Sequence, residues 1–79
     1  MNENNVPYPS VPARVQLRID GRWQEGHLIS PGVWLFPVVR NRRSVSVLAV
    51  WDGLQRRFRI LSAPEGYEEG PFAWSFALT

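Results

Sequence analysis

The fold of this chain is decided by residues 44–62, which read SVSVLAVWDGLQRRFRILS. Apolar and polar side chains alternate on both sides of Asp52-Gly53, as is typical of strands with one buried face. Asp-Gly between two such runs favours a two-residue hairpin loop of type I′. We therefore predict a β-hairpin in which Trp51 faces Leu54 across the turn.

The predicted register gives this hairpin two unlike faces. Its inner face carries three further cross-strand pairs, namely Ala49 with Arg56, Val47 with Phe58, and Val45 with Ile60. This face is apolar except for Arg56. On the outer face, Arg57 and Arg59 project beside Leu48 and Val50. Such an arginine-bearing face is typical of a protein that binds a partner through its sheet.

A helix is the competing hypothesis for residues 54–61. Leu54, Phe58 and Leu61 also fit the spacing of a helical stripe. The Asp-Gly signal before them and the match of both flanking runs to strands favour the hairpin. The distinction matters because a helix at this position would remove the outer arginine face.

A second hairpin is predicted near the start of the chain. Residues 14–19 carry apolar side chains at alternate positions, and Asp20-Gly21 marks the turn after them. A two-residue loop would place polar side chains opposite this apolar row. We therefore expect a three- or four-residue turn with a bulge, which lets Trp23 join the apolar face, and a following strand over 23–29.

Two more strands are predicted after the turn at 30–32. Residues 33–40 are apolar on both faces, as in a strand covered on both sides or one with an exposed aromatic ledge. Pro37 favours an edge or a bulge over a fully paired central position. The last strand has one aromatic face, made by Phe72, Trp74, Phe76 and Leu78. Five or six antiparallel strands at short spacing predict an all-β protein, a small barrel or sandwich.

Two longer motifs occur along the chain, Val15-x-Leu17-x-x-Asp20-Gly21-Arg22-Trp23-x-x-Gly26-x-Leu28 and Val45-x-Val47-x-Ala49-x-Trp51-Asp52-Gly53. The first resembles the opening hairpin of SH3-like and Tudor-like barrels, and the second is similar to the strand and turn that often follow there. This resemblance covers residues 15–61 and implies an SH3-like barrel. A Tudor-like module would also imply an aromatic cage for methylated side chains, and the rings available for one are Trp23, Trp34, Phe36 and Trp51. The strand at 33–40 and the aromatic last strand depart from the usual module, so the resemblance leaves the ligand open.

Length and composition limit the class of protein. The 79 residues hold one domain, which we place at 13–79 after a flexible arm at 1–12 that is interrupted by three prolines. Cysteine is absent, so there are no disulfides and no thiolate metal ligands. We find neither a secretory signal pattern nor the roughly 20 apolar residues of a membrane span. These features predict a cytoplasmic protein.

Candidate catalytic residues are few. His27 is the only histidine, and no cysteine or pair of carboxylates accompanies it. Asp20 and Asp52 belong to Asp-Gly turns, where their local conformational role is a sufficient explanation. Glu68 and Glu69 fall in a predicted loop and are interpreted as a solvated acidic patch. We therefore expect no enzyme, no catalytic residue, no metal site and no cofactor.

The predicted function is non-catalytic binding. All nine basic residues are arginine, whose planar guanidinium suits carboxylate and phosphate, although the net charge is only +2. Ten aromatic residues compete for one small interior, so some are expected at the surface. We expect a small adaptor, regulator or inhibitor that engages a protein partner or itself. Its candidate binding residues are Arg40, Arg42, Arg43, Arg57, Arg59, Trp34, Phe36 and Trp74.

A nucleic-acid-binding barrel is the alternative. The same arginines would contact phosphates if they lay together in one stripe. Trp34, Phe36 or Trp51 would stack on unpaired bases, each stack being worth roughly 1–3 kcal/mol. The low net charge and the surplus of aromatics favour a protein partner instead. The edge of the last strand is a further place where a partner strand would pair.

Overall fold

The computed structural model describes residues 11–68 and 70–76, and all of its regular elements are strands. They are β1 (Arg14–Ile19), β2 (Arg22–Glu25), β3 (His27–Ser30), β4 (Val33–Arg40), β5 (Arg43–Asp52), β6 (Arg57–Ser62) and β7 (Phe72–Ser75). The all-β class is confirmed, and β6 rules out the helix considered for 54–61. Most of the predicted arm at 1–12 lies outside the described residues, as does Leu78.

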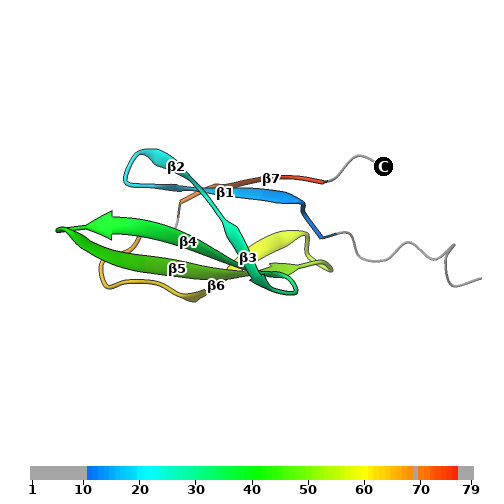
Figure 1. Cartoon of the computed structure of the whole chain (residues 1–79). Coiled ribbons are helices and arrows are strands. Elements are labelled where there is room, and N and C mark those ends of the chain that lie inside the picture. Colours follow the sequence, from blue (N-terminus) through cyan, green and yellow to red (C-terminus); the bar gives the residue numbers. More distant parts are fainter. Residues whose placement is uncertain (1–10, 69, 77–79) are drawn as a thin grey trace, which may run out of the picture.

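The strands form two antiparallel sheets that lie one over the other (Figure 1). The first has the order β2-β1-β7 and the second has the order β3-β4-β5-β6. Alternate side chains of both sheets meet between them and form the core, as strand geometry requires. The buried core residues are Val15, Leu17, Ile19, Trp34, Phe36, Val38, Val47, Ala49, Trp51 and Phe58.

The two sheets are joined at Gly26. The predicted strand over 23–29 is two strands, β2 in the first sheet and β3 in the second, and Figure 1 shows the chain crossing between them. The Gly26 N–H donates to the Val15 carbonyl at 2.9 Å. A Cβ at Gly26 would lie 2.5 Å from the Phe36 ring, so only glycine lets the chain pass this close to the core. Counting β2 and β3 as one bent strand gives six strands.

The first hairpin differs from its prediction. Ile19 pairs with Arg22, so the loop is the two residues Asp20 and Gly21, and the expected longer turn is wrong. Both loop residues have positive φ, 51° and 77°, as a type I′ turn requires. The conformation of this turn therefore sets the register. As a result, Trp23 is exposed and does not join the apolar face.

The second hairpin has a longer loop than predicted. Asp52 pairs with Arg57, so four residues, 53–56, form the loop instead of two. The Asp52 carboxylate accepts hydrogen bonds from the backbone N–H groups of Leu54 and Gln55, both at 3.0 Å. An aspartate side chain that caps the loop in this way stabilises a wider turn than the Asp-Gly pair predicts.

The register error leaves the two faces of this hairpin unchanged. The partner of Trp51 is Phe58 instead of Leu54, and the difference of four positions is even. Because side chains alternate with a period of two, the residues that remain in β5 and β6 keep their predicted faces. Leu54, predicted on the inner face opposite Trp51, lies in the loop instead and is 96% exposed. Arg56 moves out of the sheet into the loop, where its φ is 55°. The charged residue that did not fit the predicted apolar face is therefore no longer on it.

Candidate protein-binding surface

The side of the four-stranded sheet that points away from the core carries a group of aliphatic side chains. We call this side the outer face; its centre consists of Val33, Leu35, Leu48 and Val50. Val33 pairs with Val50 and Leu35 pairs with Leu48, so the four side chains form two adjacent rows. All four are half-buried, whereas the core residues on the other side of the sheet are buried. These side chains therefore pack against one another on the sheet surface and remain accessible to a partner.

Arg57 and Arg59 border this aliphatic centre on β6. Arg59 pairs with Val50, and Arg57 pairs with Asp52, whose carboxylate already caps the following loop. Both arginines are exposed, as predicted. Within 11–68 and 70–76, neither side chain makes a hydrogen bond or an ion pair. Their guanidinium groups are available to an anionic ligand.

Arg40, by contrast, is engaged within the molecule. Its guanidinium forms an ion pair with Asp20 at 3.3 Å and donates to the Glu65 carbonyl at 3.4 Å. These contacts fasten the end of β4 to the β1–β2 turn and to the loop before β7. The residue is therefore a structural clip, and its guanidinium is already satisfied by its own chain.

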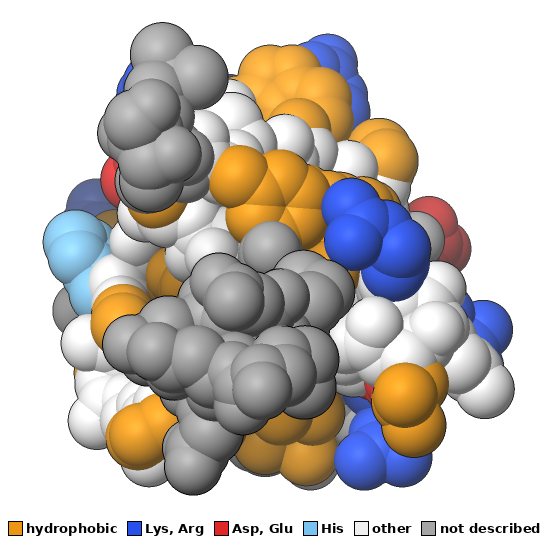
Figure 2. All heavy atoms as spheres, turned by 90° about the vertical axis from the view of Figure 1, so that its right-hand side faces the viewer, with side chains coloured by type: hydrophobic (Ala, Val, Ile, Leu, Met, Phe, Trp, Pro, Cys, Tyr) orange, Lys and Arg blue, Asp and Glu red, His pale blue; other side chains and the backbone are white. Residues whose placement is uncertain are grey.

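The arginines do not lie together in the single stripe that the nucleic-acid alternative would require. Arg42 lies in the two-residue turn between β4 and β5 with φ 62°, and Arg43 begins β5. Arg57 pairs with the last residue of β5, so the two groups lie at opposite ends of a ten-residue strand. At about 3.3 Å per residue, this strand separates them by roughly 30 Å. On the side of the molecule shown in Figure 2, arginines likewise lie apart among hydrophobic side chains.

Two of the three predicted aromatic binding residues are in the core. Trp34 is 2% exposed and Phe36 is 0% exposed, so the expectation that their rings face a ligand is wrong. The Trp34 ring meets Phe58 edge-on at 5.5 Å. Trp74 is 36% exposed, but its ring turns towards the core and lies 5.2 Å from that of Trp51. Because 33–40 is apolar on both faces, its pattern does not indicate which face is buried.

The aliphatic residues at the centre of the outer face were not among the predicted site residues. Two features of the sequence indicate them. Residues 33–40 are apolar on both faces, and the alternation places Leu48 and Val50 on the same side as Arg57 and Arg59. Aromatic residues have the larger volume, and in this chain they fill the space between the sheets. The smaller aliphatic side chains of β4 are consequently left on the outside.

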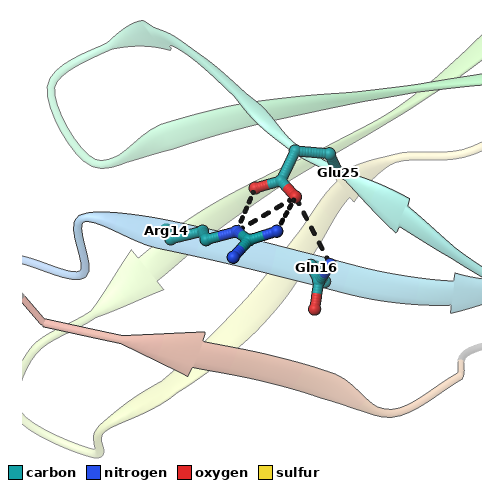
Figure 3. Close-up of polar contacts among 3 residues, drawn as sticks. All are labelled: Arg14, Gln16 and Glu25. Atoms are coloured by element: carbon teal, nitrogen blue, oxygen red, sulfur yellow. Dashed lines mark hydrogen bonds and ion pairs between the residues drawn. The ribbon is translucent and has the colours of Figure 1, made fainter.

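On the other side of the molecule, polar side chains of the three-stranded sheet contact one another (Figure 3). Arg14 Nε donates to both carboxylate oxygens of Glu25 at 3.2 Å, and Gln16 Nε2 donates to Oε1 of the same group at 3.3 Å. These hydrogen bonds and the nearby negative charge raise the pKa of Arg14. The Arg18 guanidinium lies 5.7 Å from the centre of the Trp23 ring, which is 45% exposed. Arg14 is thus paired with a carboxylate, and Arg18 lies against an aromatic ring.

Other kinds of site have little support in the described part of the chain. Residues 11–68 and 70–76 contain no cluster of three His, Asp or Glu side chains arranged to hold a metal ion. They also contain no helix of the length and hydropathy that crossing a bilayer requires. No known protein family, curated protein or solved structure matches the chain. The outer face is therefore the candidate site, on the strength of its own residues.

Proposed function

We propose that this protein is a small, non-catalytic binding module, a cytoplasmic adaptor, regulator or inhibitor, that holds a protein partner on the outer face. The observation that carries the proposal is the aliphatic centre at Val33, Leu35, Leu48 and Val50 beside two arginines that have no partner among the described residues. Apolar side chains bordered by arginine are the combination in which protein interfaces bury most of their binding energy. The bent path from β2 to β3 between the sheets supports an SH3-like barrel as the scaffold.

The partner is a different protein with an acidic border around an apolar patch. Two copies of this chain joined through their outer faces would bring Arg57 and Arg59 to a surface with few acids. Asp52 is the acidic residue on β5 and β6, and its carboxylate already accepts two backbone hydrogen bonds. A guanidinium buried without a counter-charge is costly, so self-association through this face is disfavoured. Aspartate or glutamate on a partner would pair with both arginines.

The same geometry weakens the case for nucleic acid. A cationic stripe would require the arginines near β4 and those on β6 to lie together, and they lie at opposite ends of β5. Stacking on bases would require exposed rings, and Trp34, Phe36 and Trp51 are buried. Two isolated arginine pairs support only weak contact with phosphates. A protein ligand uses what the outer face offers, which is aliphatic area next to separate positive charges.

A pair of double variants with equal charge tests the proposal. Arg57→Ser/Arg59→Ser removes two positive charges beside the aliphatic centre, whereas Arg42→Ser/Arg43→Ser removes two at the far end of β5. The wild-type protein is used to capture partners from its native host, and the dissociation constant of the captured protein is measured by calorimetry. We expect the first variant to weaken binding at least about tenfold, or ~1.4 kcal/mol, and the second to leave it almost unchanged.

Two results of the binding experiments would contradict the proposal. One is equal weakening by both double variants, because the arginines would then act through net charge alone. The other is capture of nucleic acid instead of protein, with an affinity for random single-stranded oligonucleotide that falls steeply as salt rises. Light scattering of the purified protein completes the test, since a stable dimer that dissociates in the Arg57→Ser/Arg59→Ser variant would identify self-association as the function.

A further inference from the structure

The second half of β4 has an open edge. β3 pairs with β4 only as far as Leu35, and beyond that residue β4 pairs with β5 alone among the described strands. The Gly32 carbonyl accepts from the Trp51 N–H at 2.8 Å, so the even-numbered backbone groups in this register point towards β5. The odd-numbered groups, at Pro37 and Val39, therefore point away from it.

Pro37 is compatible with this arrangement because its nitrogen lies on the open side. A proline there removes no hydrogen bond to β5 and leaves only its carbonyl at the edge. Val39 has both its N–H and its carbonyl on the same side, and its side chain is 73% exposed. No backbone partner for these groups occurs among the described residues. The open edge thus offers one donor and two acceptors.

A groove of about 540 Å³ runs along this edge. The residues that line it include Ile19, Arg22 and Gln24 from the β1–β2 hairpin, Pro37 and Val39 from β4, and Ser44 from β5. In Figure 1 that hairpin lies above the end of β4 that is joined to β5. Arg22 is exposed and makes no ion pair with any described residue. The acid nearest to it in sequence, Asp20, is already paired with Arg40.

We propose that this groove receives an extended segment of the partner chain, which adds as a strand to the open edge of β4 and places an acidic side chain on Arg22. The inference rests on the proposed function and adds the mode of recognition. Backbone groups of β4 at Pro37 and Val39 provide up to three hydrogen bonds, and a neighbouring guanidinium provides the preference for an acid. Val39 and Ser44 also belong to the outer face, so a strand bound beside β4 would extend that face with its own side chains.

The chemistry of the groove defines the segment that fits it. Successive side chains of a strand point to opposite sides, so alternate residues of the ligand meet Arg22 and Gln24 on one side and Val39 on the other. We therefore expect aspartate or glutamate alternating with β-branched aliphatic residues. The ligand residues whose N–H groups reach the carbonyls of Pro37 and Val39 cannot be proline.

A library of random ten-residue peptides, selected on the full-length wild-type protein, provides the probe. Enriched peptides are synthesised and their affinities are measured by fluorescence anisotropy against Val39→Pro, Val39→Ala and Arg22→Gln. Val39→Pro removes the N–H at the edge, whereas Val39→Ala keeps it and shortens the exposed side chain. We expect at least a tenfold loss for Val39→Pro, less than a twofold change for Val39→Ala, and a severalfold loss with reduced salt dependence for Arg22→Gln.

Hydrogen exchange of the wild-type protein gives a second readout that does not depend on how the proline variant folds. The Val39 amide should exchange quickly in the free protein and slow down at least tenfold when the selected peptide is bound. The inference is overturned if that amide stays unprotected in the complex, if Val39→Pro and Val39→Ala bind equally well, or if no peptide is enriched at low salt. If peptides instead lose affinity only in Arg57→Ser/Arg59→Ser, the proposed function stands and the groove is not its recognition site.

Discussion

The two exposed sheet surfaces of this molecule differ in how their arginines are satisfied. On the three-stranded sheet, Arg14 is held by Glu25, and Arg18 lies against the Trp23 ring. On the outer face of the four-stranded sheet, Arg57 and Arg59 have no such contact with any described residue, and their neighbours are aliphatic. Both sheets consist of strands whose side chains alternate between the two faces. The difference therefore lies in which residues occupy the outward positions.

This difference indicates which surface is suited to a partner. Covering a charged group with another protein removes water from it, and that cost is recovered only if the partner supplies a counter-charge. Arg14 and Arg18 on the outward side of the three-stranded sheet already have their contacts, so a partner would gain little by covering them. Arg57 and Arg59 would gain new ones, and the adjacent aliphatic side chains would leave water at the same time.

The largest effect is expected from adjacent substitutions on opposite sides of β5. Val47→Asp places a carboxylate in the core, where Val47 is fully buried, and should abolish folding. Leu48→Asp places the same group on the half-buried outer face and should leave a folded protein. Circular dichroism during heating distinguishes them. Equal loss of structure in both variants would mean that the outer face is covered in the native protein.

A smaller loss is expected where the chain passes between the sheets. Gly26→Ala would bring its methyl group to 2.5 Å from the Phe36 ring, which must shift within a packed core. We expect a loss of roughly 1–3 kcal/mol in the free energy of unfolding, measured by urea titration. Gly32→Ala is the control, because it meets no atom within 4 Å and carries only the strain of its φ of 76°. If Gly26→Ala lowered the free energy of unfolding no more than Gly32→Ala, the chain would not pass between the sheets at residue 26.

The strands could be predicted from the sequence because the direction of a side chain is a local property of extended backbone. The inward positions Val47, Ala49 and Trp51 follow from alternation alone, and all three are buried. The registers could not be predicted in the same way. They depend on turn geometry, namely the positive φ of Asp20 in one hairpin and the capping carboxylate of Asp52 in the other.

The candidate site was only partly accessible to sequence reasoning for a related reason. The exposure of Arg57 and Arg59 follows from the alternation of β6, and the structure confirms it. The division of β4 into an aromatic inner side and an aliphatic outer side depends on packing across the sheets, where the Phe36 ring lies 5.9 Å from that of Phe72 on β7. Contacts between residues so distant in the sequence leave no trace in a local pattern. Trp34 and Phe36 were misassigned for this reason.

Substitutions on the two surfaces should change the affinity for the partner differently and leave the free energy of unfolding almost constant. Leu35→Ser removes an aliphatic side chain from the centre of the outer face and should weaken partner binding at least about tenfold, or ~1.4 kcal/mol. Trp23→Ser removes a larger and more exposed apolar side chain from the other sheet, and we expect it to leave binding unchanged. Both affinities are measured by calorimetry against the captured partner. A greater loss from Trp23→Ser would assign recognition to the three-stranded sheet.

The smallest effects on stability are expected from substitution of two arginines, Arg40 and Arg14, that both form ion pairs. Arg40→Gln breaks the clip to Asp20 and Glu65 and should lower the free energy of unfolding by roughly 1–2 kcal/mol, because the side chain is half-buried and joins three segments. Arg14→Gln removes a solvent-accessible pair and should leave the thermal midpoint almost unchanged, especially in high salt. The raised pKa of Arg14 stabilises the folded state wherever arginine is protonated in the unfolded chain, and this contribution is lost only as the pH rises through the strongly alkaline range in which the guanidinium deprotonates. Between about pH 5 and pH 8, the range in which proteins tend to be most stable, the difference between wild type and Arg14→Gln should therefore not vary through titration of this guanidinium. A thermal midpoint that falls as far for Arg14→Gln as for Arg40→Gln would show that exposed pairing on the three-stranded sheet contributes as much to stability as the contacts of the half-buried Arg40.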